Sequence, residues 1–176
     1  MIRVMIDSDV LDDIPAGRAQ IVATYADLFT SKIAFEEFEK AHKDSIVVLI
    51  DRGLGDPLGL ASVADVEPEC LTAAQLPAWF GRKKAAGVEF LTVYSDRSDL
   101  DEIQAALKGT GHEDHWRWIA TDDGTVDISG LPALRRPAAV QILPETMIGI
   151  HADLSLVLED AWHGTEHEAA QVTLPA

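Results

Sequence analysis

Short apolar runs, each closed by acidic or polar residues, recur along this chain and constrain its fold more than any other feature. The run at residues 45–50 is nearly all apolar and β-branched, which favours a strand covered on both faces and therefore a parallel sheet. Helices are indicated between only some of the runs, as at residues 33–42, where apolar side chains recur every three or four positions. We therefore expect a repeated unit of strand, polar strand end and connector.

This repeated unit predicts an α/β fold in which strands close into a barrel and the site lies at their carboxyl ends. We expect strands at residues 2–7, 21–27, 45–50, 61–67, 90–94, 116–121, 138–143 and 153–158, and helices at 33–42, 72–86 and 100–107. Such barrels usually need about 200 residues or more, and this chain has 176. The prediction is a compact, trimmed (β/α)8 TIM barrel over residues 1–159, with some helices short or missing, followed by an acidic polar tail over residues 160–176.

Charge and composition limit the partners of the chain. Its formal net charge is −16, with a pI near 4.5, so nucleic acids and anionic membranes would repel it and we expect neither as a partner. The single cysteine, Cys70, excludes an internal disulfide. Residues 1–6 lack the features of a secretory signal, and no run approaches the length of a membrane span. We expect a protein that is cytoplasmic as made. If it acts outside a cell, it would get there by another route, such as a phage particle or lysis of its host.

Two groups of histidines have spacings that metal sites also use. His112 and His115 flank Asp114 in a glycine-flanked polar loop, and His163 and His167 lie four apart in the acidic tail. Neither group has a strong further ligand, and a solvated loop and a polar tail explain both. We expect no metal and no cofactor.

The strongest candidate site is a pair of acids at the end of one predicted strand. Asp65 and Glu67 follow the apolar residues that begin at 61, and side chains two positions apart on a strand point the same way. Pro68 cannot donate to a sheet and is expected to end the strand there. Paired carboxylates at such a strand end are typical of active sites. The alternative is that both acids face solvent on an edge strand.

Six strand-end motifs occur in the same order as in a known family. They are Ile6-Asp7, Asp65-Val66-Glu67, Thr92-Val93-Tyr94-Ser95, Trp118-Ile119-Ala120, Val140-Gln141 and Asp153-Leu154-Ser155. Over residues 4–158 the chain thereby resembles the family 25 glycoside hydrolases, the Chalaropsis-type lysozymes, and the related glycoside-hydrolase-like domains of actinobacteria and their phages. The resemblance implies a barrel fold and a substrate in the glycan of the bacterial cell wall.

The resemblance also implies a role for each matching residue. Glu67 would be the general acid, and Asp65 would stabilise the sugar oxocarbenium ion or an oxazolinium formed from the N-acetyl group of the substrate. Asp7 and Asp153 would bind substrate or set the pKa values of the pair, and Tyr94, Trp118 and Gln141 would line the substrate cleft. Asp122 departs from the family pattern, which usually has an aromatic or polar residue after the alanine of the sixth strand; we expect it to add negative charge to the substrate-binding cleft. Glycoside hydrolysis needs one protonated and one ionised carboxyl, and crowding of like charges pushes the pKa values of neighbouring acids apart.

Two functions remain open at this point. One is a muramidase-like enzyme that cleaves peptidoglycan with Glu67 and Asp65, and the intact motif that holds this pair favours it. The other is a non-catalytic minor tail or virion protein of a phage, which would use the barrel to bind cell-wall glycan or to assemble with phage tail proteins. The acidic charge and the small size of the chain favour this second function.

Overall fold

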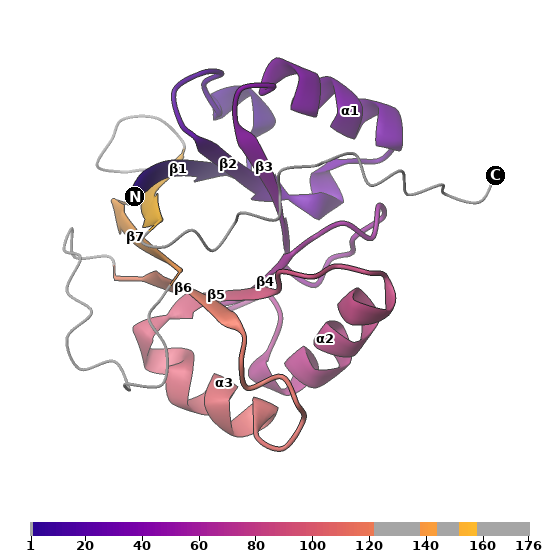
Figure 1. The fold of residues 1–176 in the computed structure, drawn as a ribbon, viewed down its shortest axis with the longest axis vertical. Helices are drawn as coiled ribbons and strands as arrows, with labels where there is room; N and C mark the ends of the chain where they lie inside the picture. Colours follow the sequence, from indigo (N-terminus) through magenta and orange to yellow (C-terminus); the bar gives the residue numbers. More distant parts are fainter. Residues whose placement is uncertain (1, 122–137, 144–151, 158–176) are drawn as a thin grey trace.

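The computed structural model describes residues 2–121, 138–143 and 152–157, which form a closed barrel of eight strands in chain order (Figure 1). The strands are β1 (Arg3–Ser8), β2 (Ile21–Tyr25), β3 (Ile46–Asp51), β4 (Val63–Val66), β5 (Thr92–Asp96), β6 (Trp116–Ala120), β7 (Ala139–Leu143) and β8 (Asp153–Val157). Their ends fall within two residues of the predicted ones. The prediction of an α/β fold with a closed eight-stranded barrel and few helices is confirmed. The predicted tail at 160–176 lies outside the described residues.

The strand directions differ from a barrel of eight parallel strands at one position. Neighbouring strands from β1 to β7 are parallel, whereas β8 is antiparallel to both β7 and β1 and closes the barrel between them. The chain length explains this difference. Only nine residues separate Leu143 from Asp153, and a crossover between parallel strands needs about a dozen or more. A short connection of this kind favours a reversed strand.

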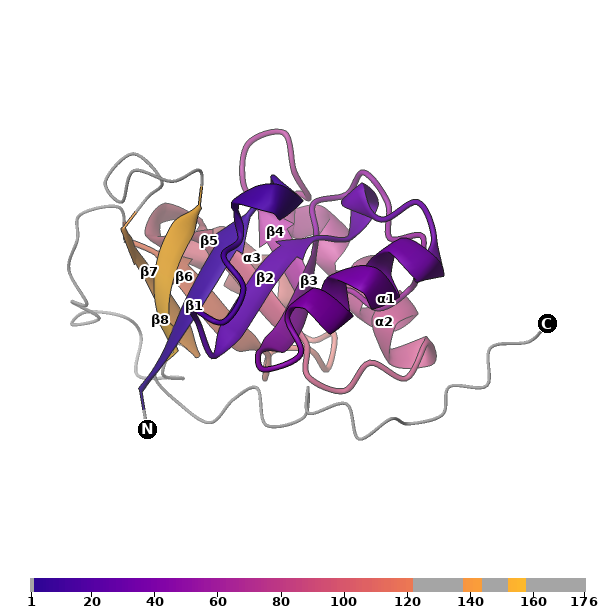
Figure 2. The ribbon, with the colours of Figure 1, turned by 90° about the horizontal axis from the view of Figure 1, so that it is seen from above.

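Three α-helices of the described residues pack on the outside of the barrel (Figure 2). α1 (Lys32–Ala41) follows β2 and buries Phe35 and Phe38 against the outer faces of β2 and β3. α2 (Leu76–Ala85) and α3 (Leu100–Leu107) follow β4 and β5, and both pack against the outer faces of these strands. All three helices were predicted, α1 and α3 from the spacing of their apolar residues and α2 from the signals at its start and end, and they cover the barrel from β2 to β5.

The start of α2 differs from the predicted helix at 72–86. Thr72 and Gln75 form a capping box, and this box begins a short 3-10 turn (Ala73–Gln75) that leads into the helix. Pro77 consequently falls in the first turn of α2, where a missing N–H costs no helical hydrogen bond.

Alternate residues of the strands fill the barrel interior. This interior cluster contains Met5, Ile21, Ala23, Val48, Ile50, Val63, Tyr94, Trp118, Ala120, Ala138, Ala139 and Val157. Trp118 is fully buried, its indole Nε1 donates to Ser155 Oγ at 3.0 Å, and its ring meets that of Tyr94 edge to face at 4.9 Å. Apolar layers therefore close the barrel core.

The interior positions become polar at one rim. Asp7 on β1, Asp65 on β4 and Asp96 on β5 continue the inward-facing series at the carboxyl ends of these parallel strands. Because β8 is reversed, its first residue, Asp153, lies at the same rim and pairs directly with Asp7 in the ladder. The fold thus collects acids from the first, middle and last parts of the described chain.

Candidate active site

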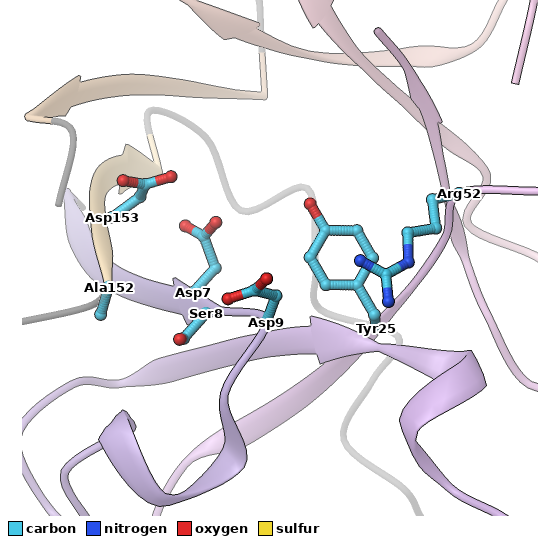
Figure 3. A pocket seen from close by; sticks show the side chains of 7 residues that line it. All are labelled: Asp7, Ser8, Asp9, Tyr25, Arg52, Ala152 and Asp153. Atoms are coloured by element: carbon cyan, nitrogen blue, oxygen red, sulfur yellow. The ribbon is translucent and has the colours of Figure 1, made fainter. Parts of the chain in front are cut away.

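A pocket of about 190 Å³ opens at this rim (Figure 3). We call it the Asp7 pocket; its lining residues are Asp7, Ser8, Asp9, Tyr25, Arg52, Ala152 and Asp153. The carboxyl groups of Asp7, Asp9 and Asp153 lie on one side, and the ring of Tyr25 with the guanidinium of Arg52 lies on the other (Figure 3). The two sides come from the ends of β1 to β3 and from the start of β8.

Asp7 is the most constrained acid of the pocket. Its side chain is only 7% exposed, and its Oδ1 atom has no hydrogen-bond partner among the described residues. Burial raises the pKa of Asp7 well above its ordinary value, and the charges of Asp153, Asp65 and Glu67 raise it further. Asp7 lies directly opposite Asp153 on the antiparallel strands β1 and β8, where two like charges repel each other. Asp7 therefore holds its proton at a pH at which an exposed aspartate is ionised.

Asp65 is fully buried inside the barrel, and one of its oxygens accepts two hydrogen bonds. Its Oδ2 receives the Tyr25 hydroxyl at 3.1 Å and the Cys70 thiol at 3.4 Å. Burial raises the pKa of Asp65 to about 6, although both hydrogen bonds and the charge of Arg52 act in the opposite direction. Because this value lies below 7, the ionised form of Asp65 predominates at pH 7. Asp65 is therefore a charged group in a site that water hardly reaches.

Tyr25 and Arg52 form a pair that supports Asp65. The Arg52 guanidinium lies 4.5 Å from the centre of the Tyr25 ring, and it binds Asp27 through Nε and Nη2 at 3.1 and 2.8 Å. Burial and the charges of Asp65 and Asp7 raise the pKa of Tyr25 above its ordinary value. The Tyr25 hydroxyl consequently stays protonated and remains a donor to Asp65 throughout the neutral range.

The turn after β4 brings a thiol onto the buried acid. The Cys70 amide donates to the Glu67 carbonyl at 3.0 Å, and the Leu71 amide donates to the Asp65 carbonyl at 3.1 Å. Glu69 adopts a φ of 71°, a left-handed conformation that is uncommon outside glycine and that reverses the chain here. This turn folds back over the end of β4 and carries Cys70 to Asp65.

Glu67 lies at the same rim but lines a neighbouring pocket. This second pocket, which we call the Glu67 pocket, has a volume of about 310 Å³. Its lining residues are Val66, Glu67, Pro68, Leu71, Thr72, Ala73, Asp96, Ser98, Asp99 and Glu102. The Glu67 side chain is half-buried, and its charge contributes to the raised pKa values of Asp7, Tyr25 and Tyr94. The charge of Glu67 therefore acts on residues of the Asp7 pocket, although the Glu67 side chain lines the neighbouring pocket.

The other predicted site residues occupy different depths of the barrel. Tyr94 and Gln141 are buried below the rim, where the Tyr94 hydroxyl donates to Gln141 Oε1 at 2.8 Å. Trp118 is deeper still and lines neither the Asp7 pocket nor the Glu67 pocket. Asp122 lies outside the described residues. The structure thus brings Asp7, Asp65, Glu67 and Asp153 together at the rim and places the two predicted aromatic residues beneath them.

Two of the histidines considered as metal ligands, His112 and His115, contact an aromatic ring, and the other two, His163 and His167, lie outside the described residues. The rings of His112 and His115 lie 5.1 and 5.7 Å from the ring of Phe80, on the outside of the barrel. Among the described residues, no group of three or more His, Cys, Asp or Glu side chains could hold a metal ion. Within the same part of the chain, no helix is long and apolar enough to cross a membrane.

The site residues that were not selected from the sequence include Tyr25, Arg52 and Cys70. Period-two alternation from Ile21 would have placed Tyr25 on the inner face of its strand. Arg52 directly follows β3, so the rule that strand ends carry the site could have selected it as well. Cys70 carried no such signal, because its position depends on the turn at residues 67–71.

Comparison of the chain with models of protein families, with curated proteins and with solved structures finds no match.

Proposed function

We propose that this protein is a muramidase-like glycoside hydrolase directed at the glycan of bacterial peptidoglycan. The observation that carries the proposal is the cluster of acids at the rim. Asp65 is fully buried there and accepts a hydrogen bond from the Tyr25 hydroxyl. The charges of Asp65 and Glu67 both act on Asp7 and Tyr25. Crowded, desolvated carboxyls of this kind titrate at different pH values, which is the condition for acid and nucleophilic or electrostatic roles in glycoside cleavage.

Each acid takes a role that its environment supports. Glu67 is the general acid, because it is half-buried at the rim and lines a pocket open to a substrate. Asp65 stays charged at neutral pH and stabilises the positive charge that develops on the sugar. Tyr25 holds Asp65 in position by its hydrogen bond. Asp7 and Asp153 bind substrate groups in the adjacent pocket.

The same proposal covers the ancestry of the fold and the location of the protein. The strand and helix order from β1 to β6 fits a (β/α)8 barrel that has been trimmed and closed by a reversed last strand. The protein would be made in the cytoplasm and would reach the glycan in a phage particle or after lysis of the host cell. A partner in the bacterial cell wall agrees with a rim rich in hydrogen-bonding groups.

A glycan-binding phage tail or virion protein without cleavage is the second candidate. The favouring observation is that Glu67 and Asp153 line different pockets, so one sugar in the Asp7 pocket does not meet the side chain of Glu67 there. Binding would then use the rim while the catalytic step is absent.

The release of reducing ends from purified peptidoglycan tests the enzyme. We expect activity in the unaltered protein, and Glu67→Gln should lower the rate by about 10²–10⁴-fold, the usual contribution of a general acid. Glu37→Gln, an identical change at an exposed position on α1, should leave the rate unchanged. Equal rates for the Glu67 and Glu37 variants would refute the role of Glu67. Glycan binding without any release of reducing ends would leave the second candidate.

A further inference from the structure

The Asp7 pocket carries an excess of negative charge. Asp7, Asp9 and Asp153 supply three carboxyl groups, and Arg52 is the one cationic side chain among the residues that line it. The charge of Arg52 is already balanced, because Nε and Nη2 both bind Asp27, which is not a lining residue. Asp9 and Asp153 therefore attract a cationic group to the carboxyl side of the pocket, and a cation bound there would favour the ionised form of Asp7, whose pKa burial raises.

The buried oxygen of Asp7 is an independent sign of a ligand. The Asp7 side chain is more than nine-tenths buried and points into the pocket (Figure 3). Its Oδ1 finds no hydrogen-bond donor among the described residues. Buried polar groups of folded proteins nearly always have a hydrogen-bond partner, so an acceptor without one, inside a pocket, fits a donor that arrives with a ligand.

A primary ammonium group matches these features better than other ligands do. It has positive charge and three N–H donors, and oxygens of Asp7, Asp153 and Tyr25 line the pocket as acceptors. A metal ion fits less well, because no three acidic, cysteine or histidine side chains of the described chain converge closely enough to hold one. The volume of about 190 Å³ lies below the roughly 300–1,000 Å³ of pockets for drug-sized ligands, so it accepts a single small group.

We propose that the Asp7 pocket binds a primary ammonium group of the cell-wall polymer, and that the protein therefore prefers glycan with free amino groups over fully N-acetylated glycan. This inference rests on the proposed glycan-directed function. The ammonium could belong to an N-deacetylated amino sugar or to the side chain of the wall peptide. Both present the same charge and the same donors to the pocket.

Calorimetric titration of the full chain at about pH 6 tests the pocket directly. The ligands are a glucosamine tetramer, an N-acetylglucosamine tetramer and a lysine-containing wall peptide with and without acetylation of its side chain. We expect acetylation of the preferred ligand to weaken binding at least tenfold, an effect that requires no protein variant. Tighter binding of the glucosamine tetramer assigns the ammonium to the sugar, and tighter binding of the peptide assigns it to the peptide.

Protein variants locate the effect. Asp7→Asn and Asp153→Asn should each weaken binding of the free amine about tenfold or more and leave the acetylated ligand unchanged. Asp44→Asn, at an exposed position before β3 at the other end of the barrel, should change neither affinity. Affinity for the free amine should also fall as salt is raised. Equal affinity for free and acetylated ligands overturns the proposal, and so does calcium binding that is lost in Asp7→Asn.

The outcomes separate this inference from the proposed function. A protein that binds the free amine at the Asp7 pocket but releases no reducing ends refutes cleavage and leaves the pocket assignment standing. A protein that cleaves fully acetylated wall with no preference for free amines refutes the pocket assignment and leaves cleavage standing.

Discussion

The pH dependence of stability follows from the burial of Asp65. Its pKa rises from 3.8 to about 6 on folding, and each pH unit corresponds to about 1.4 kcal/mol. Between about pH 4 and pH 6 the folded protein keeps a proton that the unfolded chain releases, so this group lowers the free energy of unfolding as the pH rises. Above that window the ionised, buried carboxylate costs about 3 kcal/mol relative to the unfolded chain.

Asp65→Asn removes this titration. We expect the variant to gain about 2 kcal/mol relative to the unaltered protein between pH 4 and pH 7, because part of the full cost of about 3 kcal/mol is already present at pH 4. Contributions to the free energy of unfolding that do not depend on pH, such as the cost of an unpaired amide nitrogen on the new side chain, are the same at both pH values and do not affect this comparison. Loss of the Asp65 charge also relieves Asp7, whose pKa it raises, and this acts in the same direction.

Urea unfolding followed by tryptophan fluorescence at constant ionic strength measures the difference. Trp79 and Trp118 are fully buried and report on the outer packing and on the barrel interior. Asp44→Asn serves as the matched control, since Asp44 is exposed, and it should follow the pH dependence of the unaltered protein. If the free energies of unfolding of Asp65→Asn and of the unaltered protein run parallel from pH 4 to pH 7, the argument from burial is wrong.

Two further predictions concern the neighbours of Asp65 and the backbone. Tyr25→Phe removes a hydrogen bond that lowers the pKa of Asp65, so that pKa should rise above about 6 in a carboxyl carbon NMR titration; a lower value would contradict the assigned contact. Gly53→Ala should destabilise by about 1 kcal/mol or more in thermal or urea unfolding, because φ is +90° and the new Cβ would lie 3.3 Å from Leu71. Gly81→Ala, with open space in α2, should instead stabilise by about 0.5–1 kcal/mol, and the same sign for both alanines would refute this comparison.

The strands and helices were predictable because burial leaves a local trace in the sequence. The run at β3 is apolar on both faces, and α1 and α3 show helical spacing of apolar residues. The acids at the rim were predictable for a related reason: Asp7 and Asp65 occupy the polar ends of otherwise apolar strands. In each case a few neighbouring residues contain the information.

The supporting contacts of the site depend on geometry that the sequence does not display locally. Tyr25 reaches Asp65 across the barrel interior, from a strand two positions away, so the contact depends on how the strands tilt and close. Cys70 reaches the same carboxylate through a turn that includes the left-handed Glu69. The pattern of apolar and polar residues specifies neither the diameter of the barrel nor the path of that turn.

The reversed strand β8 links chain length to the chemistry of the pocket. In the parallel part of the barrel the polar residue ends its strand, whereas in β8 the acid Asp153 begins the strand. The nine-residue connection from β7 favours this reversal, and the reversal sets Asp153 directly opposite Asp7. The charge of Asp153 then raises the pKa of Asp7, and a bound ammonium would relieve that repulsion. A connection long enough for a parallel crossover would place Asp153 at the opposite rim, and the pocket would lose the acid on which its preference for cations depends.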